Sequence, residues 1–555
     1  MKPEFLKHIS DDWVLKTLSS MSLKQKVGQL FQVAAFSNRG EEHKNEILSL
    51  IENFHLGGLT FFQGSIDQQI ELTKLYQQKS VVPLFINMDA EWGIGMRLSD
   101  GLSFPYQMTL GAIQDDQLIY DMGKKVAQQC KALGVSSPLA PVVDVNNNPS
   151  NPVINYRSFG ENKENVARKG IAYMKGLQSE NILDNAKHFP GHGDTATDSH
   201  LELPQLNHSN ERLHHIELYP FKKLIEEGLS SIMTAHLQIP VWDDADNMPT
   251  TVSSKIIKDI LTEELQFEGL LITDAMDMQG ITNHYKNGEA DLKAILAGNH
   301  IITNSCDVAA GVQCILDSIS SGKLSISLLD DAVTKILAMK RWVGLQNLHT
   351  INYSSALHQE DVEAKKLTQK LFDQALTQLG KPLAVDFSKK VAYLNLQIES
   401  KTTSTRDNVA HHLKEIKKKK EDILVDGLDT LGATIFKWKE SDSIESLQTT
   451  INTLQEFDHI IVSLHGINIK PFNHFDIPTV IRERLFLELP SERITYLHLG
   501  NVYGLDEIKG YDRIKSILVT YQDSPYAQKS IMKAFKKELS PIGQLPVSIQ
   551  HYSTP

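Results

Sequence analysis

Eight short apolar runs mark roughly the first 340 residues, and each is followed by a stretch with helical periodicity. Runs rich in Val, Ile, Leu and Phe that alternate with amphipathic segments are typical of parallel strands joined by helices. The expected strands are Gly28–Ala35, Leu56–Phe62, Pro83–Met88, Val135–Val143, Leu183–Phe189, Leu229–Ala235, Gly269–Thr273 and Asn299–Thr303. Eight such units predict a TIM (β/α)8 barrel within an α/β chain.

Polar residues follow these runs at the positions where a barrel enzyme carries its chemistry. Barrel active sites lie where strands end and the following loops begin, so these positions test the fold prediction independently of any motif. The polar residues there are Asp89, Asp144, Lys187, His188, His236, Asp274 and Asn304. The strand starts, in contrast, are apolar or glycine-rich. We therefore expect the active site at the carboxyl ends of the strands.

A second α/β pattern begins after a helical stretch at Ala364–Leu379. Its expected strands are Val391–Gln397, Ala433–Trp438, His459–Gly466, Arg493–Gly500 and Ser516–Tyr521. Helix-like segments separate them, which predicts a smaller α/β/α sandwich with a doubly wound sheet. Because 555 residues exceed what one core usually supports, we expect a barrel domain at 1–345, a helical linker at 346–380 and the sandwich at 381–555.

Composition excludes several classes of protein. The formal net charge is −12, and the one basic run, Lys417–Lys420, is interpreted as a solvated helix end, so nucleic acid is not an expected partner. Three cysteines without CxxC spacing indicate neither a disulfide framework nor a thiolate metal site. The first residues lack an apolar signal core, and no run is long enough to span a membrane. We expect a cytoplasmic protein, or a periplasmic or secreted one whose signal peptide has been removed.

The densest chemistry lies in Lys187–His200, KHFPGHGDTATDSH. Asp198 and His200, two residues apart, can hydrogen-bond across a turn, and such a carboxylate fixes the tautomer of the imidazole and raises its basicity. An imidazole held in this way can act as a general acid and base near neutral pH. A metal site is the competing interpretation, with candidate ligands His188, His192, Asp194, Asp198 and His200. Barrel metallohydrolases usually gather ligands from several strands, so no metal and no cofactor are expected.

This motif resembles the signature of the N-acetylglucosaminidase branch of glycoside hydrolase family 3. The resemblance extends over Met21–Phe36, Gly57–Gly64, Asp89–Arg97, Phe104–Ala112, Pro141–Gly160, Lys187–His200 and Thr273–Met278. It is strongest to the two-domain versions of Bacteroidetes-type bacteria. The resemblance implies that Asp274 is the nucleophile and that Asp198 and His200 form the acid/base dyad. It assigns substrate binding to Asp89, Arg157, Lys187 and His188.

Four other residues in or near these motifs have supporting or alternative interpretations. Asp277, one turn beyond Asp274, is interpreted as a helix-start residue rather than the nucleophile. Glu91 and Asp144 are expected to support the site. Trp92 stands where the family commonly has glycine, and it is either a wall of the sugar pocket or a core residue.

The resulting hypothesis is a retaining exo-β-N-acetylglucosaminidase that acts on a small saccharide, such as a peptidoglycan fragment or a chitin-type oligosaccharide. A close alternative is an N-acetylglucosaminide phosphorylase, because a neutral histidine repels phosphate less than a glutamate does. A non-catalytic sugar-binding barrel is the alternative from another class. The glucosidases of the family lack the signature at Lys187–His200, which argues against them.

Overall fold

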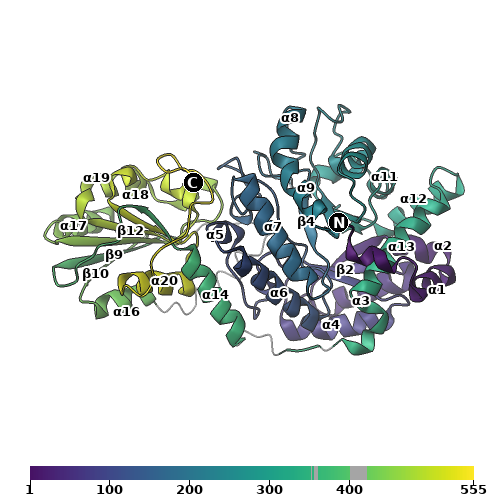
Figure 1. The fold of residues 1–555 in the computed structure, drawn as a ribbon, viewed down its shortest axis with the longest axis horizontal. Coiled ribbons are helices and arrows are strands. Elements are labelled where there is room, and N and C mark those ends of the chain that lie inside the picture. Colours follow the sequence, from purple (N-terminus) through teal and green to yellow (C-terminus); the bar gives the residue numbers. More distant parts are fainter. Residues whose placement is uncertain (200, 352, 356–360, 400–421, 555) are drawn as a thin grey trace. The chain divides into compact units, whose positions relative to one another are not determined.

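The computed structural model describes residues 1–199, 201–351, 353–355, 361–399 and 422–554 (Figure 1). His200 and the basic run Lys417–Lys420 lie outside these ranges. The chain forms two compact units. The first comprises Met1–Phe104, Asp116–Asn148 and Lys163–Ala364, and the second comprises Pro105–Asp115, Pro149–Asn162 and Lys365–Pro555. Two short segments from the amino-terminal half thus belong to the second unit.

The first unit is built on parallel strands arranged as a TIM barrel. The strands are β1 (Phe31–Ala35), β2 (Gly58–Phe61), β3 (Phe85–Met88), β4 (Asn185–Phe189), β5 (Ser231–Thr234), β6 (Leu270–Thr273) and β7 (Ile302–Thr303). They form one sheet ordered β3-β2-β1-β7 and another ordered β4-β5-β6. Single parallel bridges, Asn87 with Ser137, Val142 with Lys187 and Ile272 with Ile301, connect these sheets into a ring. The predicted barrel is confirmed.

The expected fourth strand, Val135–Val143, is wrong as a regular strand. Only Ser137 and Val142 make bridges to the neighbouring strands. Pro138 and Pro141 have no N–H to donate, so they interrupt the ladder of hydrogen bonds on both sides of Leu139. The segment still fills its place in the ring, and Asp144 follows it as expected.

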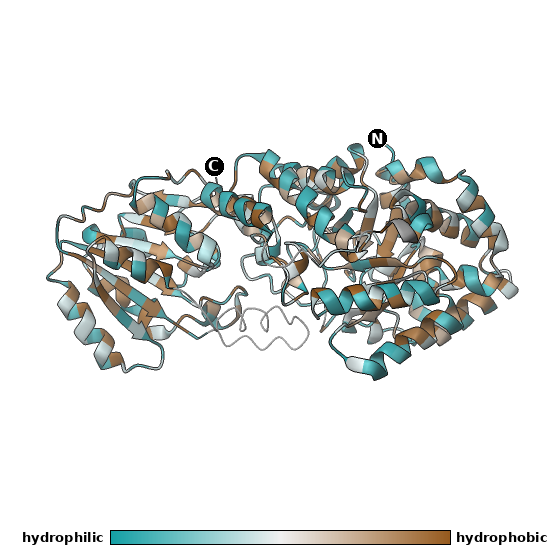
Figure 2. Cartoon of the chain, turned by 90° about the horizontal axis from the view of Figure 1, so that it is seen from below, coloured by the Kyte–Doolittle hydropathy of each residue, from teal (hydrophilic) through white to brown (hydrophobic). Residues whose placement is uncertain are grey.

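Helices surround the barrel strands. They include α3 (Gly40–Phe54), α4 (Ile66–Lys79), α6 (Asp116–Leu133), α7 (Lys163–Gln178), α9 (Leu218–Glu226), α11 (Glu289–Ala297), α12 (Val308–Ser320) and α13 (Ile326–Trp342). Side-chain caps fix the starts of α12 and α13: Asp307 accepts a hydrogen bond from Ala310 N at 3.0 Å, and Ser325 accepts one from Leu328 N at 3.2 Å. Hydrophobic residues line one face of these helices and hydrophilic residues another (Figure 2).

The second unit contains a six-stranded sheet ordered β10-β9-β11-β12-β13-β8. Its strands are β8 (Thr377–Gly380), β9 (Val391–Gln397), β10 (Thr434–Lys439), β11 (His459–His465), β12 (Ile494–His498) and β13 (Ser516–Val519). All neighbours are parallel except β8, which pairs antiparallel with β13. The accompanying helices include α14 (Val362–Ala375), α16 (Ile423–Thr430), α17 (Ile444–Leu454) and α20 (Pro525–Phe535). The predicted α/β sandwich and its five strands are confirmed.

Strand β8 lies where the sequence predicts helix. The helical stretch expected at Ala364–Leu379 ends with α14 at Ala375, and the chain then turns into the edge of the sheet. The Thr377 hydroxyl is buried and lies 2.6 Å from the Tyr521 hydroxyl, which fixes the strand beside β13. This tertiary contact overrides the helical pattern that precedes it.

The two short segments of the second unit contain α5 (Gln107–Gly111) and a 3₁₀ turn at Asn155–Arg157. Gln522 Oε1 accepts hydrogen bonds from Tyr106 N at 2.8 Å and from the Thr109 hydroxyl at 2.9 Å. Asn501 Nδ2 donates to Asn155 Oδ1 at 2.5 Å. Within the described residues no helix is both long and apolar enough to cross a membrane.

Candidate active site

The carboxyl end of β4 carries the centre of the site, and Asp144 organises it. Asp144 is fully buried and accepts hydrogen bonds from His188 Nδ1 at 2.8 Å, from His188 N at 3.1 Å and from His192 N at 2.7 Å. Burial raises the pKa of Asp144, but the charge and hydrogen bond of His188 outweigh burial, and the net pKa is lowered. The carboxylate therefore stays ionised and fixes both the backbone of the loop and the ring of His188.

A buried ionic cluster joins β3 to β4. Lys187 Nζ lies 2.8 Å from Asp89 Oδ1 and 2.9 Å from Glu91 Oε1, while Arg97 Nη2 bonds to the other oxygen of Asp89. Burial raises the pKa of Asp89, but the charges of Lys187 and Arg97 more than offset burial, so the net pKa is lowered. Asp89 is the most exposed of the four, with 20% of its side chain accessible, and it can accept hydrogen bonds from sugar hydroxyls.

Arg97 belongs to this ionic cluster at the candidate site, and sequence reasoning missed it. Its guanidinium bonds to Asp89 and lies over the ring of Phe62, 4.9 Å from the centroid. Phe62 in turn stacks on Phe36, with ring centroids 5.2 Å apart. Phe36 and Phe62 follow β1 and β2 directly, so aromatic rings border the site at these strand ends. The signal was present, because Arg97 closes the motif that begins at Asp89, but it lies nine residues beyond the end of β3.

His192 is buried inside the loop and is held in a neutral state. Burial, with a smaller contribution from neighbouring His188, lowers its pKa to about 4 against the opposing effect of Asp144 and Asp274. Its Nδ1 lies 2.7 Å from the Thr195 hydroxyl, and its Nε2 lies 3.1 Å from the Ser199 hydroxyl. The ring therefore braces the turn that leads to Asp198.

Asp274 lies directly after β6, as the sequence predicts. Its amide donates to Thr234 O at 3.0 Å, and its Oδ1 accepts a hydrogen bond from Ala275 N at 2.7 Å. The residue is half-buried, and its charge acts on His192, so Asp274 faces the loop after β4. His236, after β5, is close to Ala275 O, at 3.0 Å from its Nε2. Asp277 is exposed, in keeping with its interpretation as a helix-start residue.

The segment that carries Asp198 meets the turn that follows Asp274. Gly280 N donates to Ser199 O at 3.3 Å, and Gly280 belongs to the short helix α10 (Gln279–Thr282). A Cβ on Gly280 would lie 3.0 Å from Ser199 O and 3.4 Å from His236 Cβ. The loop after β4 and the loops after β5 and β6 therefore come together in one place, with Asp198 half-buried beside them.

Two other expectations concern Arg157 and Trp92. Arg157 belongs to the second unit, where its Nη1 donates to Val153 O at 3.3 Å. Its assignment to substrate binding therefore stays a prediction. Trp92 is 2% exposed, and its carbonyl accepts a hydrogen bond from Phe104 N at 2.8 Å, so the residue packs within the first unit.

The donors considered for a metal site are directed to different partners. His188 is bonded to Asp144, His192 lies against Thr195 and Ser199, and Asp194 bonds to His208. A different group of metal-ligand type, Asp194, His208 and Glu217, does lie together among the described residues. Arg212 donates to both carboxylates of that group, at 3.3 and 3.1 Å, and supplies the positive charge that a metal ion would bring.

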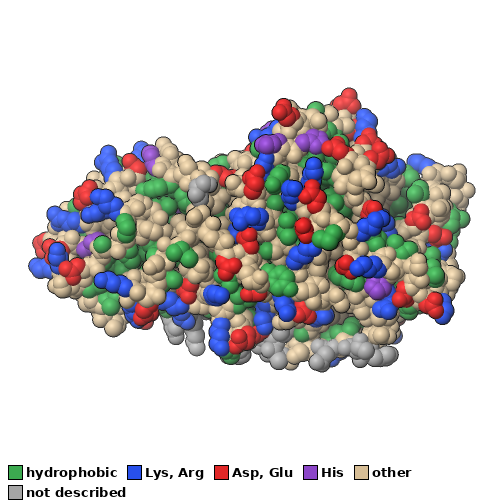
Figure 3. Space-filling view, in the orientation of Figure 1, with side chains coloured by type: hydrophobic (Ala, Val, Ile, Leu, Met, Phe, Trp, Pro, Cys, Tyr) green, Lys and Arg blue, Asp and Glu red, His purple; other side chains and the backbone are tan. Residues whose placement is uncertain are grey.

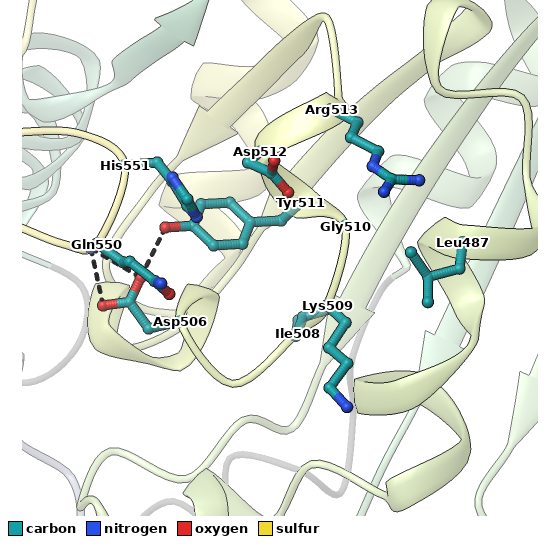
Figure 4. A pocket seen from close by; sticks show the side chains of 10 residues that line it. All are labelled: Leu487, Asp506, Ile508, Lys509, Gly510, Tyr511, Asp512, Arg513, Gln550 and His551. Atoms are coloured by element: carbon teal, nitrogen blue, oxygen red, sulfur yellow. Dashed lines mark hydrogen bonds between the residues drawn. The ribbon is translucent and has the colours of Figure 1, made fainter.

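A surface hollow of about 330 Å³ lies in the second unit, and none of the predicted site residues lines it. One of its two carboxylates, Asp506, already accepts hydrogen bonds from the Tyr511 hydroxyl at 2.6 Å and from Gln550 N at 3.0 Å (Figure 4). Acidic and basic side chains are interspersed on the molecular face in Figure 3, in keeping with the net charge of −12.

Residues 22–339 match the family model described as the Glycosyl hydrolase family 3 N terminal domain. The chain belongs to glycoside hydrolase family 3. Beta-hexosaminidase A of Pseudoalteromonas piscicida is 33% identical over 327 residues, 53% of this chain and 55% of that protein. Beta-hexosaminidase of Haemophilus influenzae is 29% identical over 290 residues, 51% of this chain and 81% of that protein.

A solved family 3 β-N-acetylglucosaminidase from Paenibacillus sp. str. FPU-7 resembles both units. It superposes with a TM-score of 0.80 at 27% identity and covers 95% of this chain and 99% of that one. A structure titled Beta-glucoside phosphorylase BglX has a TM-score of 0.82 at 22% identity, with 98% and 96% covered, and shows the fold alone. The chain spans little more than half the length of the first curated relatives that it matches.

Proposed function

We propose that this family 3 member is a retaining exo-β-N-acetylglucosaminidase. The observation that supports it most is the convergence of Asp274, the Asp198 segment and the Asp89–Lys187 pair at the carboxyl ends of the barrel strands. The similar proteins named hexosaminidase and N-acetylglucosaminidase favour the same substrate class.

The proposed reaction has two steps. In the first, the carboxylate of Asp274 bonds to the anomeric carbon while the glycosidic C–O bond breaks, and the acid/base imidazole gives its proton to the departing oxygen. In the second, the same imidazole takes a proton from water, the water oxygen bonds to the anomeric carbon, and the carboxylate of Asp274 leaves. Family resemblance assigns the imidazole to His200 and its orientation to Asp198.

Sugar recognition is assigned to the ionic cluster and to His188. Asp89 is oriented by Lys187 on one oxygen and Arg97 on the other, so its accessible lone pairs point in fixed directions. Asp144 bonds to His188 Nδ1, which fixes the orientation of the ring toward the substrate. Fixed donors and acceptors of this kind give a pocket its preference for one sugar.

The decisive experiment compares Asp274→Asn with the matched variant Asp277→Asn. On an aryl β-N-acetylglucosaminide in phosphate-free buffer, Asp274→Asn should lower kcat on the order of 10⁴-fold, while Asp277→Asn should retain activity. A 5-fluoro N-acetylglucosaminyl donor should label Asp274 covalently, as peptide mass mapping can detect. An absolute requirement for phosphate would indicate the phosphorylase, faster cleavage of the β-glucoside would indicate a glucosidase, and full activity of Asp274→Asn would refute the mechanism.

A further inference from the structure

A π-turn lies beside the loop after β4. The helical segment that runs from α8 (Asn210–Arg212) into α9 is interrupted by a π-helical turn at Leu213–Glu217, in which Leu218 N donates to Leu213 O. Such turns are rare and frequently lie at functional sites. In this turn residues five apart align along the helix, and Arg212 and Glu217 are five apart. The turn therefore places an arginine and a glutamate face to face.

These side chains bond to the loop through Asp194. Arg212 Nη2 lies 3.1 Å from Glu217 Oε1 and 3.3 Å from Asp194 Oδ2. His208, which precedes the Ser209 cap of the helix, places Nε2 2.9 Å from the same oxygen of Asp194. The Glu217 side chain is 2% exposed, and its Oε2 has no hydrogen-bond partner among the described residues. Glu217 thus depends on Arg212 for its compensating charge.

Two glycines let the loop lie close against its surroundings. A Cβ on Gly191 would lie 2.9 Å from Glu217 Cβ, and its φ of +134° is unfavourable for other residues. A Cβ on Gly193 would lie 1.9 Å from Val145 O. The loop is therefore held at Gly191 and Gly193 between the segment after Asp144 and the π-turn, five residues before Asp198 at the nearer point.

We propose that Arg212, Glu217 and His208 form a clamp that positions the acid/base segment through Asp194. They are positioning residues, because they act through the loop. The same cluster would suit a divalent cation in its donor types, but Arg212 already lies against both carboxylates, so a positional role fits better. This inference rests on the proposed function, since it concerns how that reaction receives its proton.

The test uses the dependence of glycosylation on the leaving group. A phenyl glycoside needs a proton from the acid, whereas a 2,4-dinitrophenyl glycoside departs without one. In Arg212→Met, kcat/KM for phenyl β-N-acetylglucosaminide should fall about 100-fold, while kcat/KM for the dinitrophenyl compound should stay within about threefold. The kcat for the dinitrophenyl substrate should still fall, because hydrolysis of the glycosyl-enzyme needs the general base. Azide, which needs no general base, should restore that kcat. Arg212→Lys, which keeps the charge but loses the planar fork, should lie between wild type and Arg212→Met.

Arg341→Met is the matched control. Arg341 and Asp11 have side-chain exposures of 32% and 23%, against 31% and 22% for Arg212 and Asp194, but they lie near the amino terminus. The control should leave the ratio of the two rates unchanged. Equal losses on both substrates, or no loss, in Arg212→Met and Arg212→Lys would overturn the clamp. A wild-type protein that cleaves neither N-acetylglucosaminide would overturn the proposed function as well.

Discussion

Asp144→Asn is the substitution that tests most directly how the site is organised. The amide can keep its oxygen where Asp144 Oδ1 accepts from His192 N, but its NH2 group then faces His188 Nδ1, which lies 2.8 Å from Oδ2. One charge-assisted hydrogen bond is lost, and such bonds contribute about 1.5–3 kcal/mol. We expect the free energy of unfolding to fall by about 2–3 kcal/mol.

The catalytic effect of this substitution should exceed its effect on stability. His188 must rotate or change tautomer when its partner becomes a donor, and a displacement near 1 Å can cost about 100-fold in rate. We expect kcat/KM for an aryl β-N-acetylglucosaminide to fall by that order. Initial rates and denaturant unfolding monitored by tryptophan fluorescence measure the two effects on the same preparations.

Asp184→Asn is the matched control, because Asp184 is equally buried but lies before β4, at the other end of the same strand. It accepts hydrogen bonds from Ser230 N at 2.8 Å and from the Ser230 hydroxyl at 2.6 Å. Burial raises its pKa above 3.8, so a neutral amide replaces it at lower cost. Asp184→Asn should keep kcat/KM. Wild-type rates in Asp144→Asn, or equal losses in both variants, would refute the reasoning.

Further predictions concern charge and pH. The pKa of Asp144 is lowered in the folded state, so its contribution to stability is present above about pH 3.8 and is lost as the pH falls through the lowered value. The free energies of unfolding of wild type and Asp144→Asn, measured by denaturation, should therefore converge in acid. Lys187→Met should lower the free energy of unfolding by about 3–5 kcal/mol, because Asp89 and Glu91 lose a buried cation. Adding Glu91→Gln to this variant should recover part of the lost stability. If Lys187→Met alone were as stable as wild type, the reasoning would be contradicted. Burial raises the pKa of Asp291 to about 6, so its ionised form destabilises the fold above pH 6, and there is no such cost below pH 3.8. Asp291→Asn should therefore raise the free energy of unfolding at pH 7.5 by up to about 3 kcal/mol. An equal gain at pH 3.5 would argue against this cause.

Hydrophobic periodicity was sufficient to locate most of the barrel, because each strand is buried on both faces and reads as a continuous apolar run. It failed at Val135–Val143, where prolines without N–H groups keep an apolar segment in the ring without a regular ladder. It also failed at Thr377–Gly380, where a contact with Tyr521 decides the structure. Apolar runs report burial, but they do not report which backbone groups can pair.

The site was predictable where its residues follow strands directly and was missed where loops bring them in. Asp89 and Asp274 directly follow β3 and β6, Lys187 lies within β4, and Asp144 follows the irregular segment that takes the fourth place in the ring. Arg97 lies farther along its loop, and the partnership of Arg212 with Glu217 needs a π-turn that no helical periodicity of 3.6 indicates.

The charge states of the loop after β4 favour a division of labour among its histidines. His188 is paired with an ionised carboxylate, which fixes its ring, whereas His192 is kept neutral by burial, with a pKa of about 4, and contacts hydroxyl groups. A His192 that stays neutral across neutral pH adds no ionisation to the pH–rate profile in that range. The two limbs of a bell-shaped pH–rate profile should therefore report the ionisation of Asp274 and of the acid/base imidazole. His192→Gln should weaken the loop without moving either limb. A shift of the alkaline limb in that variant would assign the proton to His192 instead.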